Sequence, residues 1–398
     1  MASPSWTIYL DYAATTPVDA CVMEAMQPFL TESFGNPSSL HVTGRLAAKA
    51  LDEARTSIAR CLNAQPDELV FTGSGTEADN LAVLGVARLR QKQNPQKNLH
   101  IITTRIEHAA VENACLQLEE EGFFLTYLEP DEAGFISVEE VAQALRPETI
   151  LVSIIHGHNE IGTLQPLEEI GGLLRDKNIL FHTDAVQTVG KLPIDLKTLP
   201  VDYLSFSAHK FYGPKGTGAL WVRSGAPRPL PLLYGGGQES GLRSGTQNVA
   251  GIVGMARALA LCCDKLESEA LRLRALQEYF IKRLPDQIPF AEVNGPVDCS
   301  LRVPGNVNVS IPGIEGEALV LHLDLAGIAA STGSACHSAV IEPSRIILAL
   351  GKGEHLARPV LRLSMGRATT KDDLDEALRV LAGIVKRFVK TDVSPALS

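Results

Sequence analysis

The 398-residue sequence is poor in cysteine and has none of the paired spacings that bind zinc. Its seven cysteines are odd in number and widely scattered, which argues against a disulfide framework and against a Cys-x-x-Cys metal site. We therefore expect no bound metal. The seven are Cys21, Cys61, Cys115, Cys262, Cys263, Cys299 and Cys336.

Long apolar runs are also missing. The longest, from Gly251 to Cys263, is too short to span a bilayer and contains Arg257. The N-terminus lacks a basic region followed by an apolar core, so no secretory signal is expected. These features favour a cytoplasmic protein that is not inserted in a membrane.

Basic residues are not in excess. The chain has 36 Lys and Arg against 46 Asp and Glu, a formal charge of −10, so nothing suggests binding to nucleic acid or to an anionic membrane surface. A hydrophobic content of 45% indicates a globular chain, long enough for two domains.

Apolar strand patterns alternate with helical patterns through the first two thirds of the chain. This alternation predicts an α/β fold, with a mostly parallel sheet flanked by helices on both faces. Strands are expected at 69–71, 99–104, 123–128, 150–155, 179–181, 201–206 and 218–222. Helices are expected at 45–62, 109–121, 137–145 and 167–176.

Helix-start signals and a second structural layer complete the prediction. Thr16 and Pro17 predict the start of a helix whose apolar stripe includes Val22 and Leu30. Residues 263–398 read as a smaller α+β layer, which the N-terminal residues are expected to join. Its expected elements are a helical region at 250–284, strands at 303–312 and 360–364, and helices at 315–325 and 371–389.

Polar residues follow successive predicted strands and should gather along one edge of the sheet, where ligands bind in α/β folds. Lys210 ends one strand among small residues, a suitable place for a Schiff-base lysine if burial or nearby cations lower its pKa. Taken alone, it could equally be a surface lysine in a Gly/Pro turn. The others are Thr76, His108, Asn159, Asp184, Gln187, Ser207 and His209.

Three further segments carry candidate sites. Thr72 to Asn80 is a glycine-rich turn opening a helix, an arrangement that binds phosphate but also occurs as an ordinary turn. Arg362, in a predicted strand, suits a carboxylate, with Arg367 as a competitor. Cys336 stands among small residues, which indicates an accessible thiol rather than a packing residue.

Over nearly its whole length the chain resembles the fold-type I pyridoxal phosphate (PLP) enzymes of the class V aminotransferase group, and among these the NifS/IscS cysteine desulfurases. The resemblance implies a large PLP-binding domain and a smaller α+β domain that carries the reactive cysteine. It rests on Leu10 to Pro17, Gly35-Asn36-Pro37-Ser38-Ser39, Ile106-Glu107-His108, Asn159-Glu160-Ile161-Gly162, His182-Thr183-Asp184-Ala185, Ser207-Ala208-His209-Lys210, Arg243-Ser244-Gly245-Thr246, Gly333-Ser334-Ala335-Cys336 and Leu361 to Arg367.

The resemblance assigns a role to each candidate residue. Lys210 would hold the cofactor and move protons, Asp184 would pair with the ring nitrogen, and His108 would stack on the ring. Asn159 and Arg362 would bind substrate, and Cys336 would receive its sulfur. The remaining cofactor ligands would be Gly75, Thr76, Asn159, Gln187, Ser207, His209 and, from the partner subunit of a homodimer, Thr246.

The implied activity is conversion of L-cysteine to L-alanine, with sulfur passing as a persulfide to an acceptor or iron–sulfur scaffold protein. Domains are expected at 16–262 (large) and at 1–15 with 263–398 (small). Selenocysteine lyase is the alternative activity, because Cys336-His337-Ser338 and Gly237-Gln238-Glu239 resemble those enzymes. A separate departure is His158, which stands where desulfurases more often have asparagine. A catalytically idle scaffold in iron–sulfur assembly is the alternative from another class.

Overall fold

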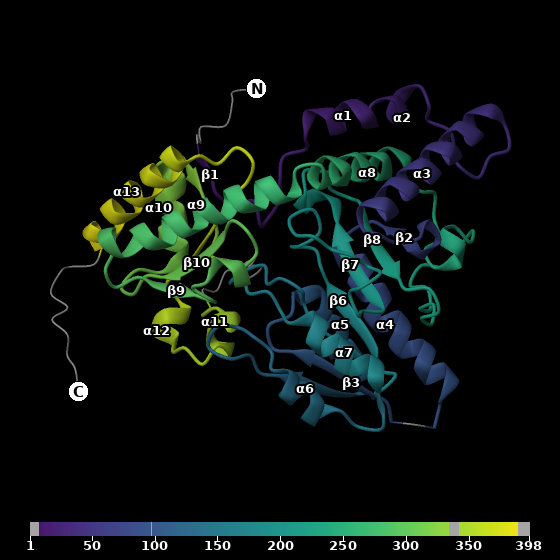
Figure 1. The fold of residues 1–398 in the computed structure, drawn as a ribbon, viewed down its shortest axis with the longest axis horizontal. Coiled ribbons are helices and arrows are strands. Elements are labelled where there is room, and N and C mark those ends of the chain that lie inside the picture. Colours follow the sequence, from purple (N-terminus) through teal and green to yellow (C-terminus); the bar gives the residue numbers. More distant parts are fainter. Residues whose placement is uncertain (1–7, 97, 334–341, 389–398) are drawn as a thin grey trace.

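The computed structural model describes residues 8–96, 98–333 and 342–388. A seven-stranded sheet lies at its centre, in the order β2-β8-β7-β6-β5-β3-β4 (Figure 1). Of these seven strands, β8 alone runs in the opposite direction to the other six, so the prediction of a mostly parallel α/β sheet is confirmed. The strands are β2 (Leu69–Thr72), β3 (His100–Thr104), β4 (Phe124–Leu128), β5 (Thr149–Ser153), β6 (Leu180–Asp184), β7 (Tyr203–Ser207) and β8 (Gly218–Val222).

Helices cover both faces of this sheet because successive strand residues point to opposite sides. Phe181 and Leu204 face a core shared with α3, α7 and α8, whereas their neighbours Leu180 and Tyr203 face a core shared with α4 and α5. The strands are therefore apolar on both faces, as parallel strands usually are. The helices are α3 (Val42–Cys61), α4 (Gly75–Gln93), α5 (Ala109–Glu120), α6 (Val138–Ala144), α7 (Leu167–Asp176) and α8 (Val249–Cys263).

A second, smaller sheet lies beside the first and has its own core (Figure 1). Its three antiparallel strands are β12 (Val360–Ser364), β10 (Asn306–Ser310) and β9 (Glu292–Asn294). The flanking helices are α9 (Leu266–Gln287), α10 (Gly316–Leu325) and α13 (Lys371–Phe388).

The start of the described chain joins this smaller layer. Strand β1 (Ile8–Tyr9) pairs in parallel with β11 (Ile328–Ala329), and Ile8 and Leu10 are buried in the core of the small sheet. A separate apolar cluster joins α11 (Arg345–Ala349) and α12 (Glu354–Ala357) to Ile106 of the large sheet. The two layers are thus in direct contact.

Two helix predictions are wrong. The first helix, α1 (Ala20–Met26), starts after Asp19, which accepts a hydrogen bond from the Cys21 N–H. Thr16 instead donates to the His209 carbonyl and accepts from the Tyr212 N–H, a tertiary contact that local signals do not encode. Pro28 then begins a separate helix, α2 (Pro28–Thr31), so the predicted apolar stripe is divided between two helices.

The predicted helical region at 250–284 also consists of two helices. Helix α8 ends at Cys263 and α9 begins at Leu266, which places a break between the two cores. The predicted strand at 303–312 shortens to β10, and the sequence patterns did not indicate β9 or β11. Both missed strands have at most three residues, too few to show a period.

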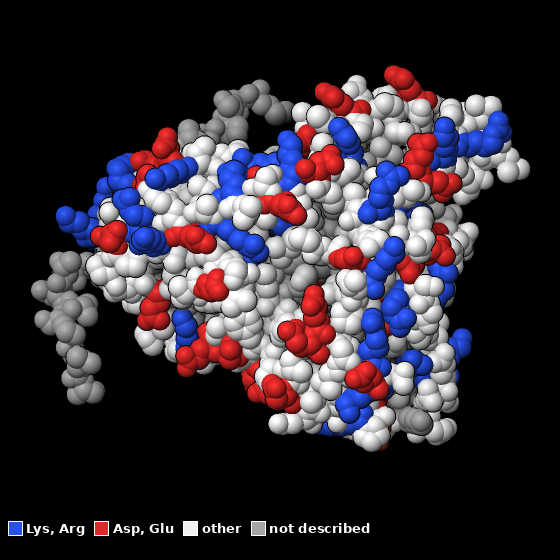
Figure 2. Space-filling model, in the orientation of Figure 1, with Lys and Arg blue, Asp and Glu red and all other residues white. Residues whose placement is uncertain are grey.

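Charge on the molecule is mixed rather than segregated. On the face shown in Figure 2, Lys and Arg side chains are interspersed with Asp and Glu. Within the part of the chain that the structure describes, no helix combines the length and apolar character needed to cross a membrane.

Candidate active site

Lys210 lies at the carboxyl end of β7, in a single turn of 3₁₀ helix, Ala208–Lys210. Its Nζ donates hydrogen bonds to the carbonyls of Ala13 (2.7 Å) and Ala14 (2.9 Å). Burial, followed by the positive charge of Arg362, lowers its pKa to about 8. Lys210 is therefore not an ordinary surface lysine, and its amine loses a proton at a pH where a free lysine keeps it.

A cavity of about 340 Å³ opens in front of Lys210, at the edge of the sheet where β5, β6 and β7 end. Ten of the twelve residues proposed from the sequence line it, and they come from both layers of the fold. These ten are Gly75, Thr76, His108, Asn159, Asp184, Gln187, Ser207, His209, Lys210 and Arg362.

The remaining two predicted residues are Thr246 and Cys336. Thr246 is exposed and is not among the residues that line this cavity. Cys336 lies outside the described residues. Ser331 and Gly333, which precede it in the chain, do line the cavity.

Arg362 comes from β12 of the small sheet and is held from two sides. Its Nη2 donates to Asp11 Oδ1 at 2.8 Å, and its Nη1 donates to the Asn159 carbonyl at 3.1 Å. Its Nε is buried without a hydrogen-bond partner among the described residues. The guanidinium is thus fixed at the cavity wall with donor capacity to spare.

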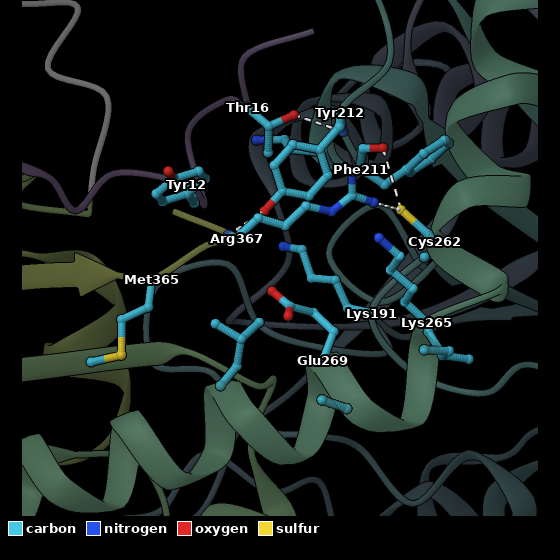
Figure 3. A pocket seen from close by; sticks show the side chains of 15 residues that line it. Tyr12, Thr16, Lys191, Phe211, Tyr212, Cys262, Lys265, Glu269, Met365 and Arg367 are labelled. Atoms are coloured by element: carbon cyan, nitrogen blue, oxygen red, sulfur yellow. Dashed lines mark hydrogen bonds between the residues drawn. The ribbon is translucent and has the colours of Figure 1, made fainter. Parts of the chain in front are cut away.

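Arg367, the competing arginine, faces a different cavity of about 240 Å³ on the far side of Lys210 (Figure 3). It pairs with Asp19 at 2.9 Å, stacks on the Tyr212 ring, and donates to the Cys262 sulfur. These contacts use N–H donors of Arg367 outside the cavity in front of Lys210. The position therefore favours Arg362 over Arg367 as a carboxylate ligand.

Gln187 and Lys191 separate the two cavities. The Gln187 amide nitrogen donates to the Ala13 carbonyl at 3.0 Å, and its oxygen accepts from Lys191 Nζ at 3.1 Å (Lys191 appears in Figure 3). Burial lowers the pKa of Lys191 to about 7. An amide nitrogen carries two N–H donors, so Gln187 keeps one for a ligand in the first cavity after its bond to Ala13.

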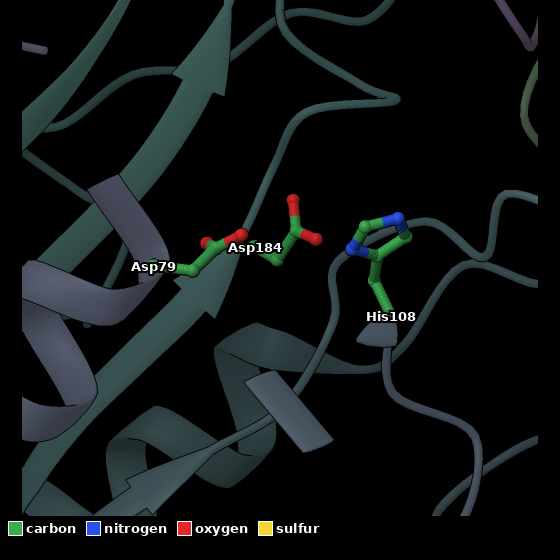
Figure 4. Close-up of side chains that lie close together, drawn as sticks. All are labelled: Asp79, His108 and Asp184. Atoms are coloured by element: carbon green, nitrogen blue, oxygen red, sulfur yellow. The ribbon is translucent and has the colours of Figure 1, made fainter. Parts of the chain in front are cut away.

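Asp184, Asp79 and His108 form a compact group on the cavity floor (Figure 4). One ligand atom from each lies within 4.8 Å of the others, the only group of this kind among the described residues that could hold a metal ion. Both carboxylates are buried. Burial raises the pKa of each, and Asp184 raises that of Asp79 further.

The neighbouring groups distinguish the two carboxylates. Asp184 accepts a hydrogen bond from the Val186 N–H at 2.8 Å and is attracted by His108 and Lys210. Asp79 Oδ1 is buried without a hydrogen-bond partner among the described residues. It lies 3.6 Å from His182, but burial lowers the pKa of that imidazole to about 3, so it is neutral. Burial and the neighbouring Asp184 both raise the pKa of Asp79, so of the two carboxyls it is the one that more readily holds a proton.

Sequence reasoning missed Asp79 and Lys191. Asp79 follows Gly75 by four positions in α4, so both lie on one helix face, a spacing that could have indicated it. Lys191 follows Gln187 by the same four positions, but these residues lie in turns rather than a helix, so the spacing did not indicate their contact.

His108 and the start of α4 complete the cavity. His108 Nδ1 accepts from the Ala110 N–H at the start of α5, which leaves Nε2 free for a ligand, and the surrounding protein lowers its pKa. At the α4 N-terminus, Ser74 caps the helix and Gly75 leaves a hollow. A Cβ on Gly75 would come within 2.7 Å of Val186 Cγ2.

The comparisons with known proteins agree with this geometry. The family model for class-V aminotransferases matches residues 8–377. The chain belongs to the class-V aminotransferase family.

Relatives within this family resemble the chain over nearly its full length. A Clostridium botulinum protein named cysteine desulfurase IscS is 48% identical over 388 residues, which cover 98% of this chain and 96% of its own. A Dictyoglomus turgidum protein of the same name is 48% identical over 381 residues, covering 96% and 95%.

Solved structures of related proteins also resemble the chain over most of its length. A NifS-like protein superposes with a TM-score of 0.88 at 37% identity, covering 96% of this chain and 99% of its own. The structure described as "SspA in complex with cysteine" superposes with a TM-score of 0.79 at 39% identity, covering 90% and 99%. The resemblance to NifS/IscS-like proteins is thereby confirmed.

Proposed function

We propose that the chain is a PLP-dependent cysteine desulfurase that converts L-cysteine to L-alanine and passes the sulfur onward as a persulfide. The observation that carries this proposal is the convergence of Lys210, Asp184, His108 and Arg362 on one cavity. Support comes from relatives about half identical over nearly the full chain that are named cysteine desulfurase.

The cavity suits pyridoxal phosphate. Lys210 supplies an amine that is readily deprotonated, and Asp184 supplies a buried carboxylate for a protonated ring nitrogen. The hollow at Gly75 is bordered by Thr76, Ser207 and His209, next to the positive end of α4, and would hold the phosphate. When bound, PLP withdraws electrons from the substrate α-carbon.

The surrounding side chains hold and orient the reactants. His108 would stack on the ring, and Gln187, whose oxygen already accepts from Lys191, would donate an N–H to the phenolic oxygen of the cofactor. Arg362 would bind the substrate carboxylate, and Asn159 would lie beside it. Lys210 Nζ would take the proton from the substrate α-carbon.

Cys336 would act as the sulfur acceptor. Its thiolate would form a bond to the substrate sulfur as the carbon–sulfur bond breaks, which leaves a persulfide on Cys336. A sulfur-acceptor or iron–sulfur scaffold protein would then receive that sulfur. We place this reaction in the cytoplasm, without nucleic acid or membrane.

We also propose a homodimer. The region from α1 to the start of α3 carries exposed apolar side chains, including Phe34 (71% exposed) and Leu40 (91%), together with Leu30, Val42 and Leu46. Large apolar side chains this exposed favour burial against another subunit. Thr246, also exposed, would then reach the phosphate bound by the partner.

The proposed division into a large domain, 16–262, and a small domain, 1–15 with 263–398, is supported by the two separate cores and by the break between α8 and α9. The cavity lies between them, since Lys210 belongs to the first and Arg362 to the second.

The deciding experiment measures alanine and sulfide released from L-cysteine, and selenide released from L-selenocysteine, by the PLP-loaded protein. Turnover of cysteine that Lys210→Ala abolishes is expected. Turnover of selenocysteine alone would establish selenocysteine lyase, and cofactor binding without either turnover would favour the scaffold.

A further inference from the structure

Two cysteines that the proposed reaction does not use lie together at the ends of two packed helices. Cys61 is the last residue of α3, and Cys263 is the last residue of α8. Cys263 Sγ donates to the Cys61 carbonyl oxygen at 4.0 Å, which places the Cys263 thiol against the end of α3. Because 202 positions separate them, only the packing of α3 on α8 creates the pair.

Both thiols are accessible to a small reagent. Each is half-buried, and both line one surface groove together with His156 and Leu266. The adjacent Cys262 is buried, and its sulfur instead contacts Arg367 and the Phe211 carbonyl. The groove thus presents Cys61 and Cys263 as a dithiol.

The interaction between the two thiols shifts their pKa values in opposite directions. The Cys263 thiol lowers the pKa of Cys61, despite the opposing effect of burial. The Cys61 thiol, followed by burial, raises the pKa of Cys263. Since thiolate is the nucleophile in thiol–disulfide exchange, Cys61 is the attacking thiol and Cys263 the resolving one.

We propose that Cys61 and Cys263 form a reversible disulfide by exchange with small-molecule disulfides of the glutathione type. The Cys61 thiolate attacks one sulfur of the reagent, the reagent S–S bond breaks, and one small thiol leaves. Cys263 then loses its proton and attacks the Cys61 sulfur, which releases the second small thiol. The two cysteines lose two electrons, and the reagent gains them.

The bond would join α3 to the last residue of α8. Only Asp264 and Lys265 separate this residue from α9, whose Leu273 and Phe280 belong to the core of the small sheet. Oxidation would therefore link α3 covalently to the start of the segment that connects the two cores. By closing a long loop, it should also raise the melting temperature.

The test uses full-length Cys336→Ala protein, so that the proposed catalytic cysteine cannot compete. The protein is incubated with oxidised glutathione, its remaining thiols are alkylated, and its peptides are mapped by mass spectrometry. We expect a Cys61–Cys263 linked pair about 2 Da lighter than the two free-thiol peptides together. Dithiothreitol should remove the link and lower the melting temperature again.

Two further variants separate the roles of the thiols. Cys263→Ala should accumulate a stable glutathione adduct on Cys61, because no resolving thiol remains. Cys262→Ala, the matched control at the neighbouring position, should still form the link.

Three outcomes would overturn the proposal. The first is glutathione that persists on Cys61 in protein that retains Cys263, at the level seen in Cys263→Ala. The second is a link that maps to Cys262 or to the exposed Cys21. Absence of any reaction at Cys61 would equally exclude the disulfide. None of these outcomes bears on the desulfurase proposal, whose residues are different.

Discussion

Arg362 and Asp11, which are 351 positions apart, form an ion pair at the wall of the candidate active site, with Nη2 2.8 Å from Oδ1. The arginine side chain is only 5% exposed. A guanidinium has five N–H donors, so Asp11 and the Asn159 carbonyl can orient it while other donors remain for a substrate carboxylate. The N-terminal segment thus positions a residue supplied by the C-terminal sheet.

Replacing Arg362 should weaken the binding of substrate much more than the binding of cofactor. Loss of a buried, charged hydrogen-bonding partner costs roughly 2–5 kcal/mol, so Arg362→Ala should lower kcat/KM for cysteine by about 30- to 4000-fold. PLP affinity, measured by titration of its absorbance, should change little. Arg367→Ala is the matched control, and damage to kcat/KM from Arg367→Ala alone would transfer the role to that residue.

The Lys210 amine should titrate near pH 8 in cofactor-free protein. Its pKa, about 8, lies below the ordinary lysine value of 10.5, so the amine is protonated below pH 8 and neutral above it. Reductive methylation at Lys210, followed by mass spectrometry, should accelerate with a midpoint near pH 8. Because Arg362 contributes to the lowered pKa, Arg362→Gln should move this midpoint upward, and an unchanged midpoint would contradict that cause.

The same pKa shift has a consequence for stability. A buried lysine with a lowered pKa destabilises the folded state most at pH values below 8, and this cost disappears as the pH approaches 10.5. Lys210→Met should therefore raise the free energy of unfolding of cofactor-free protein at pH 7, with a smaller gain at pH 10. Urea denaturation at the two pH values measures the difference, and an equal gain at both would exclude a contribution from titration.

Asp184 and Asp79 should respond differently to the same substitution. Asp184→Asn should lose most activity and change the absorbance spectrum of bound PLP, because the ring nitrogen would lose its carboxylate partner. Asp79→Asn should preserve the spectrum, since an amide resembles the protonated carboxyl that we assign to Asp79. A spectrum altered as strongly by Asp79→Asn would show instead that Asp79 is ionised.

Cys336 should be the only cysteine that gains sulfur during turnover. After incubation with cysteine, a persulfide adduct of about 32 Da should map to Cys336 by mass spectrometry under non-reducing conditions. Cys336→Ala should keep the colour of bound PLP and form no adduct. Cys115 is an internal control, because burial raises its pKa to about 12. An adduct on another cysteine, or full turnover of cysteine by Cys336→Ala, would contradict the assignment.

Local sequence patterns predicted the strands of the large sheet and placed the candidate catalytic residues at its edge. Parallel strands such as β6 and β7 are apolar on both faces and end in polar residues. Asp184 and Lys210 could therefore be recognised as candidate site residues from the apolar residues that precede them in the sequence. The family resemblance added their roles, along with those of Arg362 and Cys336. Short strands such as β9 and β11 could not be predicted, because two or three residues do not establish a period.

Only the tertiary structure decided which distant groups meet. Thr16, a suitable helix cap by sequence, contacts His209 and Tyr212 instead, because the packing of the N-terminal segment offered it stronger partners. The same holds for the pair of Cys61 and Cys263, which are 202 positions apart in the sequence. Local sequence determines which residues can form helices and strands, whereas charge, burial and hydrogen bonding depend on neighbours that only the folded chain brings within a few ångströms.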